Sequence, residues 1–121
     1  MMAVHELEVS VRDNGGVAIL DLVGDVDSSA EGVLQEAYEH AAREPRPIAL
    51  NFSSTGYINS TGIALIVGLL AQSRARGIQI TAFGLSDHYR EIFEITRLAD
   101  FMTIADNENG AVDGAERSNH A

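Results

Sequence analysis

A short polar segment, Asn59-Ser60-Thr61-Gly62, directly precedes the most apolar run of the sequence, Ile63 to Ala71. Two adjacent hydroxyls at such a junction can start a helix, because an N-cap serine accepts a hydrogen bond from a free backbone amide. A hydroxyl can also be a nucleophile, but Ser60 lacks the G-x-S-x-G pattern of a hydrolase, and no nearby histidine is evident as its base. The segment therefore predicts a helix N-terminus capped by Ser60, and it does not predict an enzyme.

The composition excludes several classes of function. The chain has 121 residues and a formal net charge of −10 at pH 7, so its surface repels nucleic-acid phosphates and anionic membranes. It contains no cysteine and no lysine, which excludes thiolate metal sites, cysteine nucleophiles, a P-loop lysine and Schiff-base chemistry. No metal or cofactor is predicted, because metal-ligand spacing is absent among the histidines, which are His5, His40, His88 and His120.

The hydropathy pattern predicts a cytoplasmic protein. The run from Ile63 to Ala71 is far too short to span a bilayer, and the N-terminal "MMAVHELEV" lacks the basic segment of a signal peptide. We expect one domain in residues 1–105. Residues 106–121 combine acidic side chains with Gly110 and Gly114, which predicts a weak helix or a disordered tail.

The N-terminal half has the pattern of a β-hairpin followed by a helix. Asn14-Gly15-Gly16 is typical of a hairpin turn, because asparagine and glycine accept positive φ angles. Ser28 and Glu31 fit a capping box at the start of the helix. The predicted elements are the strands Val4–Asp13 and Val17–Val23 and a helix from about Ser29 to Arg43.

The C-terminal half alternates strands with helices. Gly77 fits the end of one helix, and Ser86 fits the N-cap of the next, in which Ile92, Phe93 and Ile95 are predicted to be buried. The predicted elements are the strand Ile48–Phe52, the loop Ser53–Tyr57, the helix Thr61–Arg76, the strand Ile78–Gly84, a helix to about Leu98 and the strand Phe101–Ile104.

The order β-β-α-β-α-β-α-β predicts an α/β fold with a small, mostly parallel sheet and an antiparallel first hairpin. Right-handed crossovers make the strands after the hairpin parallel. If each new strand is added outward, the crossover helices gather on one face. The other face of the sheet is then expected to be less well covered.

The apolar helix after Ser60 has two apolar sides. Leu65 and Leu69 lie off the predicted core stripe, so they either pack on neighbouring helices or form a docking surface beside Ser60. The predicted core stripe is Ile63, Ile66, Val67 and Leu70.

Two aspartates follow the second strand, at the sheet edge where Ser60 is also expected. Asp25 and Asp27 predict an acidic rim that contacts a partner, since the carboxyl ends of parallel strands lie together. The alternative for Asp27 is that it caps the first helix. The sequence gives less indication of a structural role for Asp25, so Asp25 is the stronger candidate for contact with a partner.

The segment Asn51 to Ile104 resembles the core of the STAS domain, the fold of bacterial anti-sigma factor antagonists. That family typically has D-[ST]-[ST]-G after the third strand, then an apolar helix, a glycine, a strand and a helix ending F…TGL. "LVGDVDSSA", Leu22 to Ala30, is likewise similar to the family's GELD…TA segment. The resemblance covers Val4 to Ile104 and implies a STAS-like domain.

The resemblance implies a regulatory binding module in which Ser60 occupies the phosphorylated position. The implied partner is an anti-sigma factor that is also a serine kinase of the ATPase type. The unphosphorylated protein would bind this partner, and phosphorylation would release it. The expected partner-binding residues are Asp25, Asp27, Asn59, Thr61, Gly62, Leu65 and Leu69.

Asn59 departs from the family pattern, which usually has aspartate before the serine. This difference leaves open a STAS scaffold, or a domain associated with an anion transporter, that is never phosphorylated. An anion or nucleotide binder at the same helix N-terminus is a third hypothesis, and the absence of lysine and of a glycine-rich loop disfavours it.

Overall fold

The computed structural model describes residues 5–119, and the side chains of residues 5–115. Val4 of the first predicted strand and residues 120–121 of the predicted tail lie outside the described residues. Within residues 5–119, no helix combines the length and the apolar character that a membrane span requires. The elements are β1 (Glu8–Asn14), β2 (Val17–Val26), η1 (Ser28–Ala30), α1 (Glu31–Ala41), β3 (Ile48–Ile58), α2 (Ser60–Arg76), β4 (Ile80–Phe83), α3 (Asp87–Ile95), η2 (Leu98–Asp100), β5 (Thr103–Ala105) and α4 (Glu108–Asn119).

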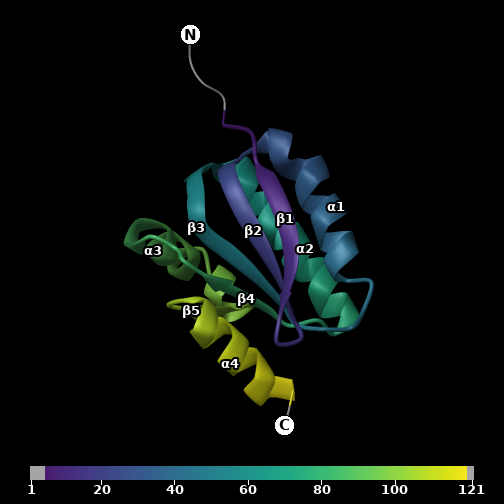
Figure 1. Ribbon diagram of the computed structural model, residues 1–121. Helices are drawn as coiled ribbons and strands as arrows, with labels where there is room; N and C mark the ends of the chain where they lie inside the picture. The colour runs from purple at the N-terminus through teal and green to yellow at the C-terminus, as the bar shows by residue number, and fades with distance from the viewer. Residues whose placement is uncertain (1–4, 120–121) are drawn as a thin grey trace.

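The strands form a five-stranded sheet in the order β1-β2-β3-β4-β5 (Figure 1). β1 pairs antiparallel with β2, and every later neighbour is parallel. Gly15 and Gly16 make the hairpin turn with φ angles of 61° and 88°. The predicted α/β fold, with its antiparallel first hairpin and mostly parallel sheet, is confirmed.

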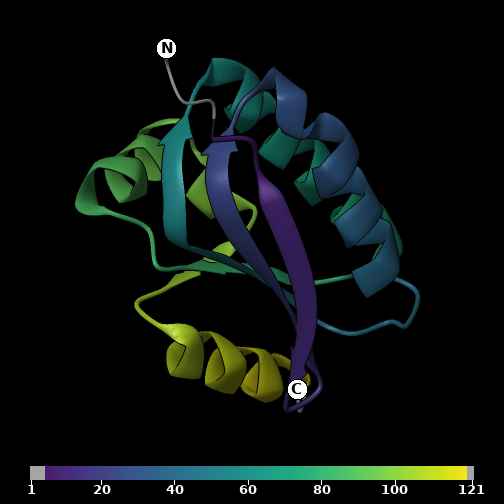
Figure 2. The same ribbon diagram turned by 45° about the horizontal axis from the view of Figure 1, so that its top comes forward.

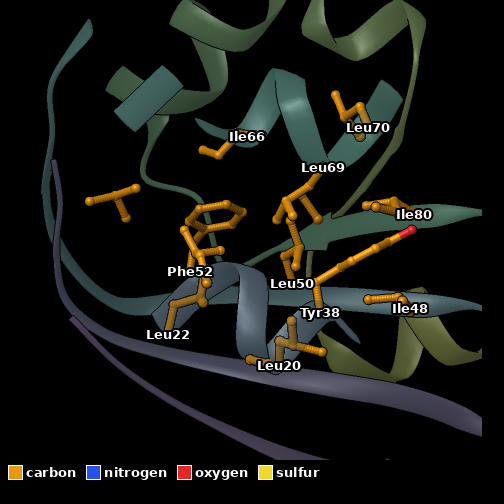
Figure 3. Close-up of a cluster of buried hydrophobic side chains, with 14 of the residues drawn as sticks. Leu20, Leu22, Tyr38, Ile48, Leu50, Phe52, Ile66, Leu69, Leu70 and Ile80 are labelled. Atoms are coloured by element: carbon orange, nitrogen blue, oxygen red, sulfur yellow. The ribbon is translucent and has the colours of Figure 1, made fainter. Parts of the chain in front are cut away.

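The main core lies between the sheet and the helices α1, α2 and α3 (Figure 3). Apolar side chains of β2 and β3, such as Leu20 and Leu50, point toward the helices because successive residues of a strand face opposite sides. The Ser73 hydroxyl on α2 donates to the Tyr38 hydroxyl on α1 over 3.1 Å, so the two buried polar groups satisfy each other. This core fixes α2 against the sheet.

Part of the opposite face of the sheet is covered by α4 (Figure 2). The sequence predicted that this face would be less well covered than the other, and that residues 106–121 would form a weak helix or a disordered tail. The structure has a helix, α4, in this segment, and its Ala111, Val112 and Ala115 are buried against the sheet. Their sheet partners are Val17, Ile19, Ala49 and Phe83.

An ion-pair cluster fastens the first turn of α4 to β1 and β2. The Arg12 guanidinium donates to Asp21 over 2.6 Å from Nε and to Glu108 over 2.6 Å from Nη2. These hydrogen bonds hold the pKa of Asp21 and the pKa of Glu108 below their ordinary values. The Asn14 amide also donates to Glu108 over 2.6 Å. α4 is thus joined to the hairpin by charge as well as by apolar packing.

The largest boundary error of the sequence-based prediction concerns β3. The predicted strand ends at Phe52, but β3 continues to Ile58 through the segment expected to be a loop. The extension pairs with the end of β2, at Val23 with Ser54 and at Val26 with Ile58, and two register shifts accommodate it. The other elements begin or end a few residues from their predicted bounds.

Two details of the helices also differ from the prediction. Ser28 does not cap α1 with Glu31, because Asp27 caps the short helix η1 that precedes α1. Ile95 is exposed rather than buried, whereas Phe93 is fully buried. α3 buries a narrow stripe, and Ile95 lies outside it because residues two apart on a helix point about 200° apart.

Arg97, which follows α3, adopts φ 66° and ψ 17°, and it is the non-glycine residue with positive φ among residues 5–119. This left-handed conformation favours glycine, because a Cβ crowds the backbone there. We expect Arg97→Gly to raise the free energy of unfolding by about 0.5–1 kcal/mol in urea titrations. Arg97→Ala is the matched control, because it removes the same side chain and keeps the strain. A glycine variant less stable than the alanine variant would contradict this account.

Candidate functional site

The N-terminus of α2 is capped by Asn59 and not by Ser60. The Asn59 side-chain oxygen accepts a hydrogen bond from the backbone N–H of Gly62 over 2.9 Å. Asn59 has extended backbone angles, as an N-cap residue does, and Ser60 is the first residue of the helix. The prediction of Ser60 as the cap was therefore wrong, and its hydroxyl is left free for another role.

Gly62 allows α2 to approach the end of β2 closely. A Cβ added at this position would lie 2.0 Å from the backbone oxygen of Val26. The same oxygen accepts a hydrogen bond from the backbone N–H of Asn59 over 3.2 Å. Gly62 is buried, so its part in the site is to hold the helix N-terminus against β2.

Ser60 and Thr61 are both exposed at this helix end. In the described part of the chain, neither side chain makes a hydrogen bond or an ion pair. The first amides of a helix have no carbonyl of a preceding turn to bind, so they and the helix dipole favour an anion at this end.

The two candidate aspartates both make structural hydrogen bonds. Asp27 accepts the backbone N–H of Ser29 over 2.9 Å and its hydroxyl over 2.6 Å, which is the capping alternative. Asp25 accepts the backbone N–H of Tyr57 over 2.9 Å and so fixes the end of β3. Both aspartates remain partly exposed at the sheet edge that carries Ser60. Asp25 therefore has a structural role, at the end of β3, that the sequence did not indicate.

The two candidate leucines of α2 have different positions. Leu69 is 3% exposed and points into the core beside Leu50 and Tyr38 (Figure 3), so it takes the packing alternative and cannot meet a partner. Leu65 is half-buried against the same core. The predicted core stripe was also wrong at Val67, which is exposed. Compared with the predicted orientation, α2 is rotated about its axis, so that Leu69 lies in the core and Val67 faces outward.

Sequence reasoning missed two tyrosines at the site. Tyr57 was placed in a loop, but it stands near the end of β3 with 62% of its surface exposed. Tyr89 on α3 accepts the backbone N–H of Ile58 over 2.9 Å through its hydroxyl, and so it supports the strand end before Ser60. The sequence did contain a signal for Tyr57, because an aromatic residue stands only three positions before Ser60.

Among the described side chains, those of residues 5–115, no group of three histidine or acidic residues is arranged to hold a metal ion. What the site presents is a free hydroxyl, a helix N-terminus and a partly acidic rim. Such an arrangement can accept a phosphoryl group and contact a protein.

Comparison with known proteins identifies the fold and its relatives. The family model described as "STAS domain" matches residues 8–111. A curated relative is the anti-sigma-B factor antagonist of Listeria monocytogenes, which is 30% identical over 109 residues that cover 89% of this chain and 94% of that protein.

Solved structures show the same fold at lower sequence identity. The anti-sigma factor antagonist of Mycobacterium paratuberculosis superposes with a TM-score of 0.80 at 13% identity, covering 96% of this chain and 99% of that one. The Bacillus cell fate determinant SpoIIAA in its phosphorylated form superposes with a TM-score of 0.66 at 20% identity, covering 88% and 97%. At these identities the superpositions establish the fold alone.

Proposed function

The chain belongs to the STAS domain family, and we propose that it is an anti-sigma factor antagonist switched by phosphorylation of Ser60. The relative in Listeria monocytogenes that shares 30% identity over most of this chain carries the antagonist name. The observation that carries the proposal is the free, exposed Ser60 hydroxyl at the first position of α2. The partner is an anti-sigma factor that is a serine kinase of the ATPase type.

The cap by Asn59 supports this assignment of roles. An N-cap serine would be tied to a backbone amide, whereas here Asn59 binds the Gly62 amide and Ser60 is unbound. Asparagine performs the cap that the family's aspartate would perform, without its negative charge. The departure from the family pattern therefore preserves the geometry that exposes Ser60.

Phosphorylation at this position changes charge and leaves the fold intact. Ser60 Oγ attacks the γ-phosphorus of ATP, the new O–P bond forms, the bond to the β–γ bridging oxygen breaks, and ADP leaves. The hydroxyl proton passes to a base of the kinase. The phosphate adds about −1.5 to −2 charges beside free helix amides, which tolerate an anion.

Release of the partner follows from where the new charge lies. A kinase that phosphorylates Ser60 must hold its nucleotide phosphates against this hydroxyl. After transfer, phosphoserine lies against the terminal phosphate of ADP, and the two like charges repel in a desolvated contact. The unphosphorylated antagonist binds, and the phosphorylated antagonist dissociates.

Mapping of the phosphate tests the proposal. The protein is incubated with each purified ATPase-type anti-sigma factor of its source organism and ATP, and the modified residue is identified by mass spectrometry. We expect a single phosphate on Ser60, none on Ser60→Ala, and full modification of Thr61→Ala. Modification elsewhere, or none with any of these kinases, would contradict the switch and favour the scaffold hypothesis.

A further inference from the structure

α4 covers only part of its face of the sheet. It packs on Val17 and Ile19 in the first half of β2, and Asp21 on the same face belongs to the Arg12 cluster. Side chains alternate along a strand, so Val23 lies on this face too, beyond the end of α4. Val23 is 48% exposed in the described structure. In Figure 2, α4 lies against the hairpin-turn end of the sheet, far from the C-terminal ends of β2 and β3.

A hollow of about 420 Å³ lies beside Val23. Its lining is His5, Glu6, Glu8, Val23 and Gly24. Glu8 stands opposite Val23 in the β1–β2 pairing, so its carboxylate flanks the apolar floor. Gly24, with φ 114°, lets the backbone of Glu6 come close, since a Cβ there would lie 2.6 Å from the Glu6 oxygen. The hollow combines an apolar floor with a carboxylate rim.

Tyr57 adjoins this hollow through Asp25. The backbone N–H of Asp25 donates to the oxygen of His5 over 2.8 Å, while its carboxylate accepts the N–H of Tyr57 over 2.9 Å. Asp25 therefore joins the segment that lines the hollow to the strand that carries the tyrosine. The Tyr57 ring is exposed, and its backbone is fixed, so it needs little ordering on binding.

We propose that the partner docks on this surface, placing a long basic side chain in the hollow and an apolar group on Tyr57. The inference rests on the proposed function and extends its contact surface from Ser60 onto the open sheet face. Charge selects the occupant: among the described residues, Glu6 and Glu8 line the hollow beside Val23, and no arginine does. Asp25 follows Gly24 in the chain and adds a third carboxylate next to the hollow. An arginine fits best, because its apolar stem covers Val23 while its guanidinium meets the rim.

Negative charge has opposite effects on partner binding at the two places: it favours binding at the carboxylate rim and disfavours binding at Ser60. Glu8 and Glu6 attract basic groups of the partner, whereas a phosphate on Ser60 meets the partner's nucleotide. Removal of a rim charge should therefore weaken binding, as addition of a charge at Ser60 does. Rim attraction between exposed charges is screened by salt.

Binding measurements without ATP test this surface. Isothermal titration with the purified ATPase-type anti-sigma factors is run on wild type, Tyr57→Ala and Glu8→Gln at low and high salt. We expect Tyr57→Ala to weaken binding at least tenfold at both salt concentrations. We expect Glu8→Gln to weaken it about threefold at low salt and to have little effect at high salt.

Two exposed residues at the opposite sheet edge are matched controls. Phe101 is 58% exposed, and Glu44 lies in the exposed turn before β3. Phe101→Ala and Glu44→Gln should bind within about twofold of wild type. If wild type binds and Tyr57→Ala and Glu8→Gln match these controls, the docking surface is wrong while the proposed function stands. If wild type binds none of the anti-sigma factors, both fail.

Discussion

Gly62→Ala should destabilise the protein by about 3 kcal/mol or more, although it adds a single methyl group. The new Cβ would lie 2.0 Å from the Val26 oxygen and 2.8 Å from its carbonyl carbon. Neither atom can retreat easily, because the oxygen also accepts the Asn59 N–H over 3.2 Å and β2 pairs with β3 at Val26. Urea unfolding followed by circular dichroism measures the loss.

Gly68 provides a control within the same helix. It lies in the interior of α2, and a Cβ at this position would meet nothing within 4 Å. Gly68→Ala should therefore stabilise the protein by about 0.5–1 kcal/mol, the ordinary gain in helix propensity. Opposite signs for the two glycines are the expected result. A Gly62→Ala variant as stable as wild type would refute the close approach of α2 to β2.

The antiparallel hairpin and the parallel direction of the later strands could be predicted from turn chemistry and crossover handedness, whereas the outward order of the strands was an assumption. The turn at Gly15 and Gly16 and the alternation of β1 fix a hairpin, and right-handed crossovers fix the parallel strands. The helix Thr61–Arg76 was misplaced by a single residue. Asn59 and Ser60 are both good caps, and the choice between them depends on where Gly62 meets Val26.

The parts that could not be predicted depend on contacts distant in sequence. α4 has poor helix signals, and it is fixed by packing on the sheet and by a bond between Arg12 and Glu108, which are 96 residues apart. The extension of β3 contains Gly56 and polar residues, and it forms because β2 supplies a pairing partner. Tertiary contacts also decide that Leu69 rather than Val67 is buried, because α2 is apolar on both sides and its own sequence does not select one of them.

Ser60→Asp should weaken binding of the nucleotide-loaded anti-sigma factor at least tenfold, about 1.4 kcal/mol. The carboxylate mimics part of the phosphate charge and lies where the partner holds its own phosphates. Ser60→Ala should bind like wild type, because the Ser60 side chain makes no hydrogen bond in the described part of the chain. Isothermal titration against the ADP-bound and the nucleotide-free anti-sigma factor measures both.

Ala75→Asp tests whether the loss of binding depends on the position of the added charge or only on the net charge of the protein. Ala75 is exposed near the other end of α2, so this variant has the same net charge as Ser60→Asp and should bind within about twofold of wild type. Equal losses for the two variants would refute a local switch. Unfolding cannot account for the loss in Ser60→Asp, because an acidic residue in the first turn stabilises a helix by about 0.3–1 kcal/mol. Weaker binding by a protein at least as stable as wild type therefore places the effect at the contact between Ser60 and the nucleotide.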